Sequence, residues 1–201
     1  MRTITKITKI TVYNYNELSA EAKKNVETLY LNSLNPIVFK NIWEGGLEAC
    51  FPHSDLNLQF SFNYDEEDGA NIYGRIFYKD LITFFKDSFT EKEMSIIEQA
   101  IQKSNINSCI MEKNIYGNYC VMHWNNFICD IVDELYPEDN APEDVLNILF
   151  KFNNRIKNYF HTFCNNIKTA GYKYFYEVNE EKIKNWIDIN KYEFLENGDI
   201  Y

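Results

Sequence analysis

The chain has 201 residues, and 45% of them are hydrophobic, which is enough for a packed core and excludes a disordered chain. Its net charge of −10 at pH 7 argues against binding nucleic acid by phosphate neutralisation, because that mode needs clustered lysine and arginine. The length fits a single domain over residues 1–201. We expect this domain not to bind nucleic acid directly, and either a basic partner or high solubility would explain its acidity.

The sequence contains no segment that predicts secretion or membrane insertion. Its first residues, MRTITKITKITVYNYN, lack the apolar run of a signal peptide, and no later run approaches the ~20 apolar residues that span a bilayer. The five cysteines are an odd number without a C-x-x-C motif, so reduced thiols are expected. These features favour a cytoplasmic protein.

The N-terminal part is predicted to form a strand and two helices. Residues 3–13 are rich in Thr, Ile and Val, which favour extended structure. Ser19 is a suitable N-cap for a helix with apolar residues at helical spacing. Pro36 suits the first turn of a second helix, although Gly45 and Gly46 weaken it.

Two alternating segments flank a run of carboxylates and predict a β-hairpin. Apolar and polar side chains alternate in LNLQFSFNY (56–64), and the same period continues in ANIYGRIFY (70–78). Asp68 and Gly69 lie between the two segments, and glycine supplies the positive φ that a tight turn requires. The predicted turn is therefore Asp68-Gly69.

The middle of the chain predicts helices and a second pair of strands. The capping box TEKE (90–93) begins a helix. Residues 106–115 and 119 to about 132, with a turn at 116–118, read as two further strands, although FICDIVDELY (127–136) also fits a helix. Pro142 precedes a helix from residue 143 to about 169, with apolar residues three and four apart, and Gly171 is expected to end it.

The remaining residues predict a short strand (YKYFYEV), a helix capped by Asn179, and a hairpin whose turn is Asn197-Gly198. Taken together, the elements predict an α+β fold. Antiparallel hairpins or a sheet pack against helices, including one long helix near residues 143–169.

The stretches NELSAEAKKNV near the start, DGANIYG after the strand LQFSFNY, and INKYEFLENGDIY at the end together resemble a family of uncharacterised bacteriophage and prophage proteins. Asp68, Gly69, Ala70 and Gly74 match the family's turn, whereas the family usually has glycine at the position of Glu67. The resemblance implies a phage setting, in which small acidic proteins often inhibit host defence nucleases, including as anti-CRISPR proteins. An antitoxin-like role is the second function that it implies.

The acidic run Asp65, Glu66, Glu67 and Asp68 has three interpretations: a turn, an acidic tip that binds a partner, or a metal or catalytic site. An EF-hand loop with glycine at its sixth position would need an acid where Tyr64 stands. Adjacent acids at a strand tip alternate in direction and stay solvated, which does not fit a catalytic pair. We favour the turn, keep the partner-binding tip as the functional alternative, and expect no metal.

Two tracts, residues 41–74 and 114–150, contain acidic residues without any lysine or arginine. The first includes Glu44, Glu48 and Asp55 in addition to the acidic run. A solvated surface explains such tracts, and so does a surface that docks on a basic partner. The candidate partner-binding residues are Asp65, Glu66, Glu67, Asp68, Glu138, Asp139, Glu143 and Asp144.

Every histidine lies three residues from a cysteine, in the pairs Cys50 and His53, Cys120 and His123, and His161 and Cys164. Zinc binds both residue types, and His161 and Cys164 on the long helix would share a face, whereas Cys120 and His123 would point to opposite faces of a strand. Free cysteine is commonly a core residue. No phosphate loop, dinucleotide fingerprint, nucleophile elbow or zinc-protease motif occurs. We expect no enzyme and no cofactor; a metal-dependent enzyme would use Cys50, His53, His161 and Cys164.

The sequence thus predicts a non-enzymatic phage or prophage protein that inhibits a host nucleic-acid-binding effector, such as a Cas nuclease. Its acidic residues would occupy the effector's basic surface. The alternative is an antitoxin-like or accessory phage protein that acts through an apolar contact with another protein.

Overall fold

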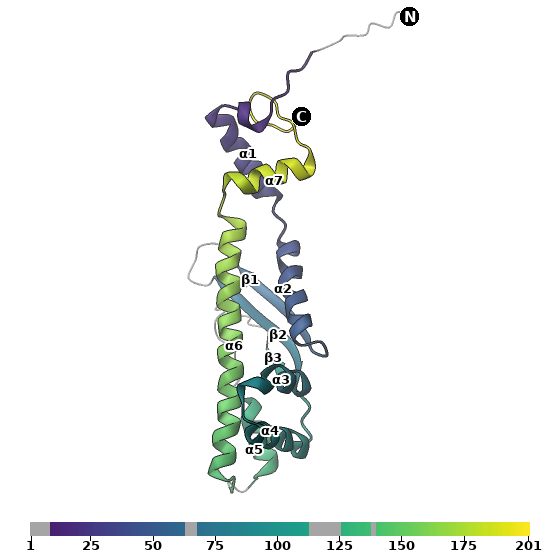
Figure 1. Cartoon of the computed structure of the whole chain (residues 1–201), viewed down its shortest axis with the longest axis vertical. Helices are drawn as coiled ribbons and strands as arrows, with labels where there is room; N and C mark the ends of the chain where they lie inside the picture. Colours follow the sequence, from purple (N-terminus) through teal and green to yellow (C-terminus); the bar gives the residue numbers. More distant parts are fainter. Residues whose placement is uncertain (1–8, 63–67, 113–125, 138–139) are drawn as a thin grey trace, which may run out of the picture. The chain divides into compact units, whose positions relative to one another are not determined.

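The structure is a computed structural model that describes residues 9–62, 68–112, 126–137 and 140–201. Helices and a small sheet form this part of the chain (Figure 1), which confirms the α+β prediction. The elements are η1 (Tyr15–Glu17), α1 (Ala20–Ser33), α2 (Pro36–Cys50), β1 (Asp55–Ser61), β2 (Gly69–Phe77), α3 (Tyr78–Phe85), η2 (Lys86–Ser88), α4 (Glu91–Ser104), β3 (Ser108–Met111), α5 (Asn126–Leu135), α6 (Glu143–Phe175) and α7 (Glu180–Asn190).

The contacts within the chain separate it into two compact units. One, the terminal unit, joins Met1–Asn35 to Lys173–Tyr201. The other, the central unit, is Pro36–Tyr172 and contains the sheet.

Both predicted N-caps of the terminal unit are confirmed. The Ser19 hydroxyl accepts a hydrogen bond from the Ala22 amide at 3.1 Å at the start of α1. The Asn179 side chain accepts one from the Lys182 amide at 2.8 Å at the start of α7. Each cap satisfies a backbone donor that has no partner inside its own helix.

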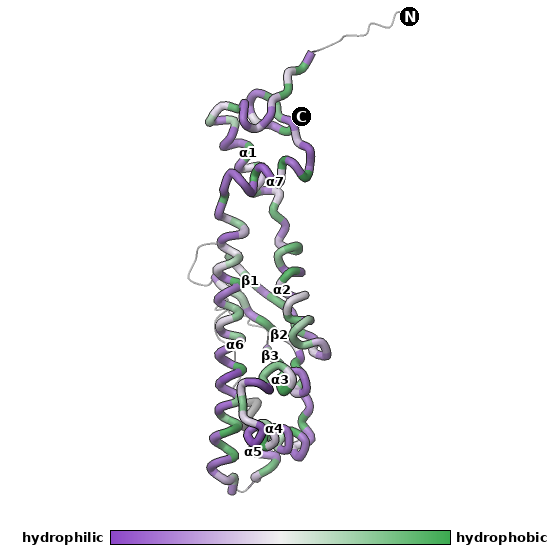
Figure 2. Tube along the Cα trace, viewed as in Figure 1, coloured by the Kyte–Doolittle hydropathy of each residue, from purple (hydrophilic) through white to green (hydrophobic). Residues whose placement is uncertain are grey.

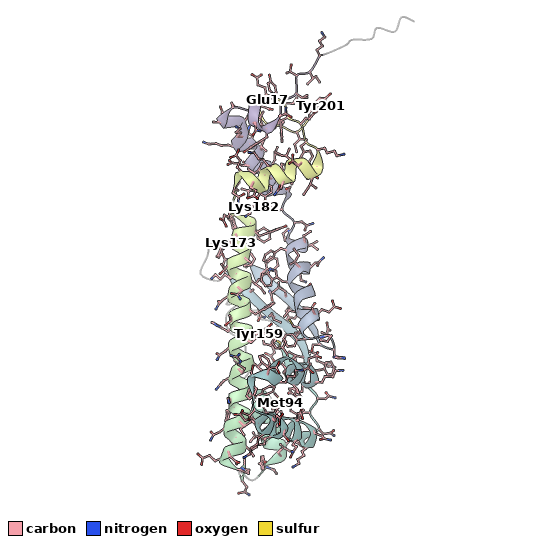
Figure 3. The ribbon with its side chains drawn as sticks, viewed as in Figure 1. Glu17, Met94, Tyr159, Lys173, Lys182 and Tyr201 are labelled. Atoms are coloured by element: carbon pink, nitrogen blue, oxygen red, sulfur yellow. The ribbon has the colours of Figure 1, made fainter. Side chains whose placement is uncertain are left out.

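The last turn of α6 is fastened to α7 by a lysine. The Lys182 ammonium group donates to the carbonyl oxygens of Lys173 and Glu177, both at 2.9 Å. Figure 3 labels Lys173 near the end of α6 and Lys182 in α7. Carbonyls at the C-terminal end of a helix lack intrahelical donors, and a cation also favours the negative end of the helix dipole. Lys182 therefore satisfies this helix end.

The core of the terminal unit brings α1 and α7 together with the chain's last residues. Its buried residues are Tyr15, Leu18, Ala22, Val26, Tyr30, Ile183, Ile187 and Phe194. Phe194 forms isolated β-bridges with Tyr13 and Ile200, and Gly198 turns the closing hairpin with φ of 89°. The predicted Asn197-Gly198 turn is confirmed, and a Cβ at Gly198 would also collide with the Ala22 carbonyl.

The predicted strand at residues 3–13 is wrong for its described part. Residues 9–12 form no ladder, and only Tyr13 makes a bridge, before η1 begins at Tyr15. β-propensity alone forms no strand, because extended backbone needs a partner for its hydrogen bonds, and of residues 9–13 one makes a bridge. Residues 1–8 lie outside the described part.

The sheet of the central unit is antiparallel in the order β1, β2, β3, and the predicted hairpin is confirmed. Its register pairs Asp55 with Arg75 and Ser61 with Gly69. Gly74, in the middle of β2, has φ of 126°, and a Cβ there would collide with the Asp55 carbonyl. Gly74 is therefore required by the close approach of β1.

The tight turn predicted at Asp68-Gly69 is wrong. Gly69 pairs with Ser61 as the first residue of β2, so residues 62–68 form the connection. Among the described glycines, positive φ values occur at Gly74 and Gly198 and not at Gly69. The turn signal failed because Gly69 already belongs to the paired part of β2. Residues 63–67 lie outside the described part.

The long helix is confirmed as α6, but it does not end at Gly171. Gly171 is buried inside the helix, where an added Cβ would collide with the Phe62 ring. The strand predicted for YKYFYEV is wrong, since α6 continues to Phe175. Apolar and polar positions recur along α6 (Figure 2), and its buried residues keep helical spacing up to Gly171, which outweighs the β-propensity of the aromatic residues that follow.

The segments between the hairpin and α6 are partly as predicted. The Thr90 capping box is confirmed, with the Thr90 amide donating to the Glu93 carboxylate at 2.8 Å. β3 is one strand of the predicted second pair, and FICDIVDEL (127–135) lies in the helix α5, as in the helical alternative. Residues 113–125 lie outside the described part.

None of the helices in the described ranges is both long and apolar enough to cross a membrane.

Replacing Gly171 by alanine tests the contact between α6 and the hairpin. Alanine normally stabilises a helix interior over glycine by up to ~1 kcal/mol. Here we expect Gly171→Ala to lower the free energy of unfolding by about 1–3 kcal/mol, because the methyl group overlaps the Phe62 ring. Urea unfolding followed by circular dichroism measures the change.

The matched control is Gly46→Ala in α2, where an added Cβ has no atom within 4 Å. This variant should leave the stability unchanged or raise it by up to ~1 kcal/mol. Equal effects of the two substitutions would contradict the packing assigned to Gly171.

Candidate functional site

The acidic residues predicted to bind a partner are only partly described. Asp65, Glu66, Glu67, Glu138 and Asp139 lie outside the described residues. Glu143 and Asp144 are exposed in the first turn of α6, where carboxylates stabilise the positive end of the helix dipole. This position gives both residues a structural reason for being acidic and leaves them accessible.

Asp68 has a different environment, because only 2% of it is exposed. The Tyr172 hydroxyl of α6 donates to its Oδ2 at 2.6 Å, and the Ser61 hydroxyl of β1 donates to its Oδ1 at 3.2 Å. The carboxylate thus joins the base of the hairpin to α6. A partner-binding role for Asp68 stays a prediction that its burial does not favour.

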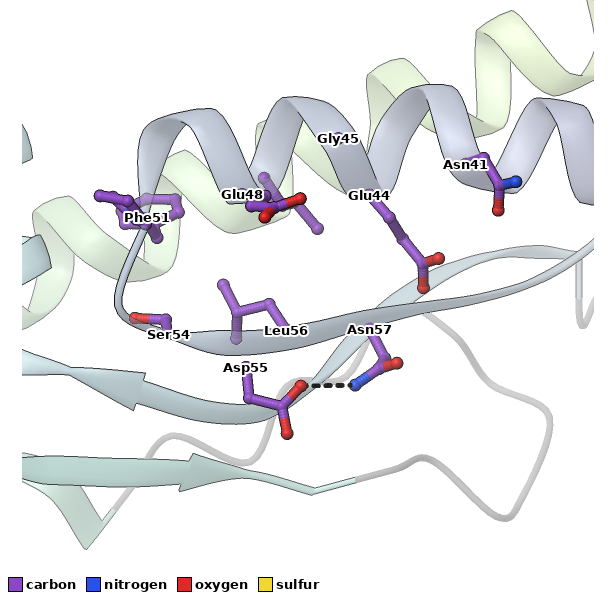
Figure 4. A pocket seen from close by; sticks show the side chains of 11 residues that line it. Asn41, Glu44, Gly45, Glu48, Phe51, Ser54, Asp55, Leu56 and Asn57 are labelled. Atoms are coloured by element: carbon purple, nitrogen blue, oxygen red, sulfur yellow. Dashed lines mark hydrogen bonds between the residues drawn. The ribbon is translucent and has the colours of Figure 1, made fainter.

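A pocket of about 430 Å³ lies between α2 and β1 (Figure 4), and we call it the acidic groove. Its polar lining residues are Asn41, Glu44 and Glu48 from α2, and Ser54, Asp55 and Asn57 from the opposite wall. No lysine or arginine is among the described residues that line it. The groove therefore concentrates negative charge from the first acid-only tract.

Glu44 holds the two walls of the groove together. Its Oε1 accepts a hydrogen bond from the Leu58 amide of β1 at 2.8 Å, and the Lys40 ammonium group lies 3.4 Å from the same oxygen. A carboxylate that accepts a backbone hydrogen bond and pairs with a lysine is already satisfied. Glu44 is consequently a positioning residue of the groove.

Glu48 and Asp55 are the exposed carboxylates of the groove. Asp55 receives a long contact, 3.5 Å, from the Asn57 amide nitrogen (Figure 4). Carboxylates and side-chain amide oxygens that face one pocket can accept several hydrogen bonds from a guanidinium or ammonium group. The groove is thus chemically suited to a lysine or arginine side chain.

One end of the groove is fixed by a buried carboxylate, Asp80 in the first turn of α3. Its oxygens accept hydrogen bonds from the Ser54 hydroxyl at 2.6 Å and the His53 amide at 2.9 Å, and His53 Nδ1 lies 2.7 Å away. Burial raises the pKa of Asp80, but the hydrogen bonds from Ser54 and His53 outweigh burial, so its pKa is lowered. Asp80 stays ionised at neutral pH and holds the turn between α2 and β1.

The cysteines and histidines that could form a zinc site have other neighbours. His53 contacts Asp80, His161 contacts Asn165 at 3.3 Å, and Cys164 is buried. Burial raises the pKa of a further thiol, Cys109, to about 12, so it is not an activated nucleophile. Within the described ranges, no group of three or more His, Cys, Asp or Glu residues could hold a metal ion.

Sequence reasoning noted the acidic tract of Glu44, Glu48 and Asp55 but did not place these residues in one site. The sequence signal for the groove is the spacing of these acids. Glu44 and Glu48 are four residues apart, so they lie on one side of a helix, and Asp55 begins the strand that follows it. Asp80 and its link to His53 were missed, since contacts between residues 27 positions apart leave no local pattern.

Comparisons with known proteins found no match for this chain, whether to a family model, to a curated protein or to a solved structure.

Replacing Asp80 by asparagine tests the element that fixes the groove. The buried hydrogen bonds from His53 and Ser54 would lose their charged acceptor, so we expect Asp80→Asn to lower the free energy of unfolding by about 1–3 kcal/mol. The pKa of Asp80 is lowered in the folded chain, so its contribution is present above the unfolded pKa of about 3.9. It is lost as pH falls through the folded pKa.

Urea unfolding at pH 7 and again at about pH 3 should therefore show a smaller difference between wild type and Asp80→Asn at the lower pH. The control is Asp87→Asn, an exposed carboxylate of η2, which should change the stability by less than ~0.5 kcal/mol. A difference that does not shrink on acidification would contradict the charged role of Asp80.

Proposed function

We propose that the protein is a non-enzymatic binding protein whose acidic groove receives a basic side chain of another protein. The observation that carries the proposal is the gathering of Glu48 and Asp55, with Glu44 behind them, in a pocket lined by no described lysine or arginine. Charge complementarity of this kind selects a partner and raises the rate of encounter.

The partner that fits best is a protein with a basic nucleic-acid-binding surface. Such proteins expose clustered Lys and Arg, and a chain of net charge −10 is attracted to them over several ångströms at moderate salt. The resemblance to phage and prophage proteins makes a host defence effector, and among these a Cas nuclease, the specific proposal. Occupying its basic channel would exclude nucleic acid, in the manner of an anti-CRISPR protein.

A second function is favoured by the exposed side of α2. Val38 and Ile42 are 48% and 64% exposed, and added Cβ atoms at Gly45 and Gly46 would meet nothing within 4 Å. This face has apolar and small residues, which suits close contact with another protein. It supports an antitoxin-like or accessory role that depends on apolar burial and not on charge.

The test is binding of the purified protein to guide-loaded Cas effectors, measured by biolayer interferometry together with displacement of target DNA. Reversing the exposed carboxylates in Glu48→Lys/Asp55→Lys should weaken binding at least about tenfold, because like charges then meet the basic surface. A variant that still binds and still displaces DNA would refute the electrostatic proposal.

Glu98→Lys/Glu91→Lys is the matched control, because it makes the same charge change at exposed positions of α4 outside the groove. It should retain most of the binding. Ile42→Asp probes the alternative: loss of binding in this variant, with little dependence on salt, would favour the apolar contact over the acidic groove.

A further inference from the structure

The exposed side of α6 differs in charge from the rest of the chain. The protein has 30 acidic residues, but none between Val145 and Tyr176. Lysine, arginine and asparagine take their place at the exposed positions of this stretch. The acid-only tracts and this acid-free stretch therefore put opposite charges on different surfaces of the chain.

A second groove, of about 700 Å³, lies between α6 and the segment around η2, and we call it the amide groove. Its α6 wall consists of Asn147, Phe150, Lys151, Asn154, Arg155 and Asn158. Asp87, Ser88 and Phe89 form the opposite wall. The groove thus combines three carboxamides with two cations and two aromatic rings.

The two cations of the amide groove are in different states. Lys151 lies 2.6 Å from the Glu93 carboxylate and 5.2 Å from the centre of the Phe89 ring, so its charge is already compensated. The hydrogen bond from Lys151, with those from Thr90, lowers the pKa of Glu93 to about 2, and the pair stays ionised at neutral pH. Arg155 is exposed, and no ion pair or hydrogen bond holds it within the described part of the chain.

The three carboxamides of the amide groove are also accessible to a ligand. Asn147, Asn154 and Asn158 are exposed, and the described part of the chain offers their side chains no hydrogen-bond partner. A carboxamide both donates and accepts, which matches the paired N–H and C=O groups of a peptide backbone. The three side chains lie on one side of α6, because their spacings of seven and four residues are whole helical turns to a good approximation.

Their spacing along the helix also fits an extended chain. Four helical residues rise about 6 Å, close to the length of two extended residues, which is the interval at which backbone groups point to the same edge of an extended chain. A peptide lying along α6 could therefore present backbone groups to Asn154 and Asn158 together. The exposed ring of Phe150, 48% accessible, would contact an apolar side chain of that peptide.

We propose that the amide groove binds an extended peptide segment of another protein, with its backbone held by Asn154 and Asn158 and an Asp or Glu side chain held by Arg155. Arg155 can bind a carboxylate with two parallel hydrogen bonds. Asp87, on the opposite wall, repels the peptide's carboxylate and so favours its placement beside Arg155. The Asp87 carboxylate can itself accept a hydrogen bond from a backbone N–H of the peptide.

A nucleic-acid strand fits the amide groove less well. Phosphate binding depends on several uncompensated cations, whereas this groove offers Arg155 and contains the carboxylate of Asp87. The amide groove and the acidic groove share no lining residue, so the peptide site does not depend on the proposed function.

The test screens the full-length protein against a yeast-displayed library of random dodecapeptides, followed by fluorescence polarisation with synthetic fluorescein-labelled peptides from the enriched pool. We expect enriched peptides to share an acidic residue and to bind Asn154→Ala about tenfold more weakly than wild type, because a pair of backbone hydrogen bonds is lost. Asn166→Ala, which removes an exposed amide of α6 outside the groove, should bind like wild type.

Arg155 is tested by a double-mutant cycle. Arg155→Ala should weaken binding of the acidic peptide about tenfold but change little for the same peptide with its acid replaced by the matching amide. The Glu48→Lys/Asp55→Lys variant should bind the peptide like wild type, which separates this site from the acidic groove.

Three outcomes would overturn the proposal. They are a screen without enriched peptides, peptide affinities that Asn154→Ala and Arg155→Ala leave unchanged, and binding of an oligo(dT) probe that Asn154→Ala abolishes while no peptide binds.

Discussion

The carboxylate of Asp80 is the constraint on which the arrangement of the central unit depends. It accepts hydrogen bonds from His53 and Ser54 in the turn where α2 leads into β1, and the Ser54 hydroxyl in turn accepts one from the Phe77 amide at the end of β2. One buried charge therefore fixes a helix, two strands and the start of α3 with respect to each other. The acidic groove exists because α2 and β1 leave this turn side by side.

The two surfaces proposed for binding follow from how charge is distributed along the chain. The first acid-only tract supplies the carboxylates of the acidic groove, and the acid-free stretch of α6 supplies one wall of the amide groove. In each groove one charged residue already has a partner within the chain: Glu44 accepts a hydrogen bond from the Leu58 amide, and Lys151 pairs with Glu93. Other charged residues of the grooves are accessible. The paired residues hold the groove walls in place, and the accessible charged residues can bind a partner.

Local signals in the sequence predicted most of the helices. Ser19, Thr90 and Asn179 cap helices because their side chains reach amides within three residues, and this is a purely local interaction. The stripe of α6 and the alternation of β1 and β2 were also readable. Failures occurred where distant contacts decide: Gly171 continues a helix because Phe62 needs the space, and Gly69 pairs in a strand instead of turning.

The candidate sites were harder to predict than the fold. The sequence drew attention to Asp68, but its carboxylate is held inside by Tyr172, a residue 104 positions away. It named Glu48 and Asp55 as members of a tract without placing them in one groove, since that depends on the turn that Asp80 holds. The lack of acids in α6 can be read from the sequence, but the amide groove also requires the opposite wall, formed by η2 and Phe89, which only the fold brings next to α6.

The most direct test of the central claim, that the acidic groove binds a basic surface, is the salt dependence of affinity for a Cas effector. The neutral double variant Glu48→Gln/Asp55→Asn would be compared with wild type between about 50 and 500 mM salt. The account predicts that wild-type affinity falls steeply with salt and that the variant binds more weakly with a shallower slope. Equal affinities and equal slopes for the two proteins would contradict it.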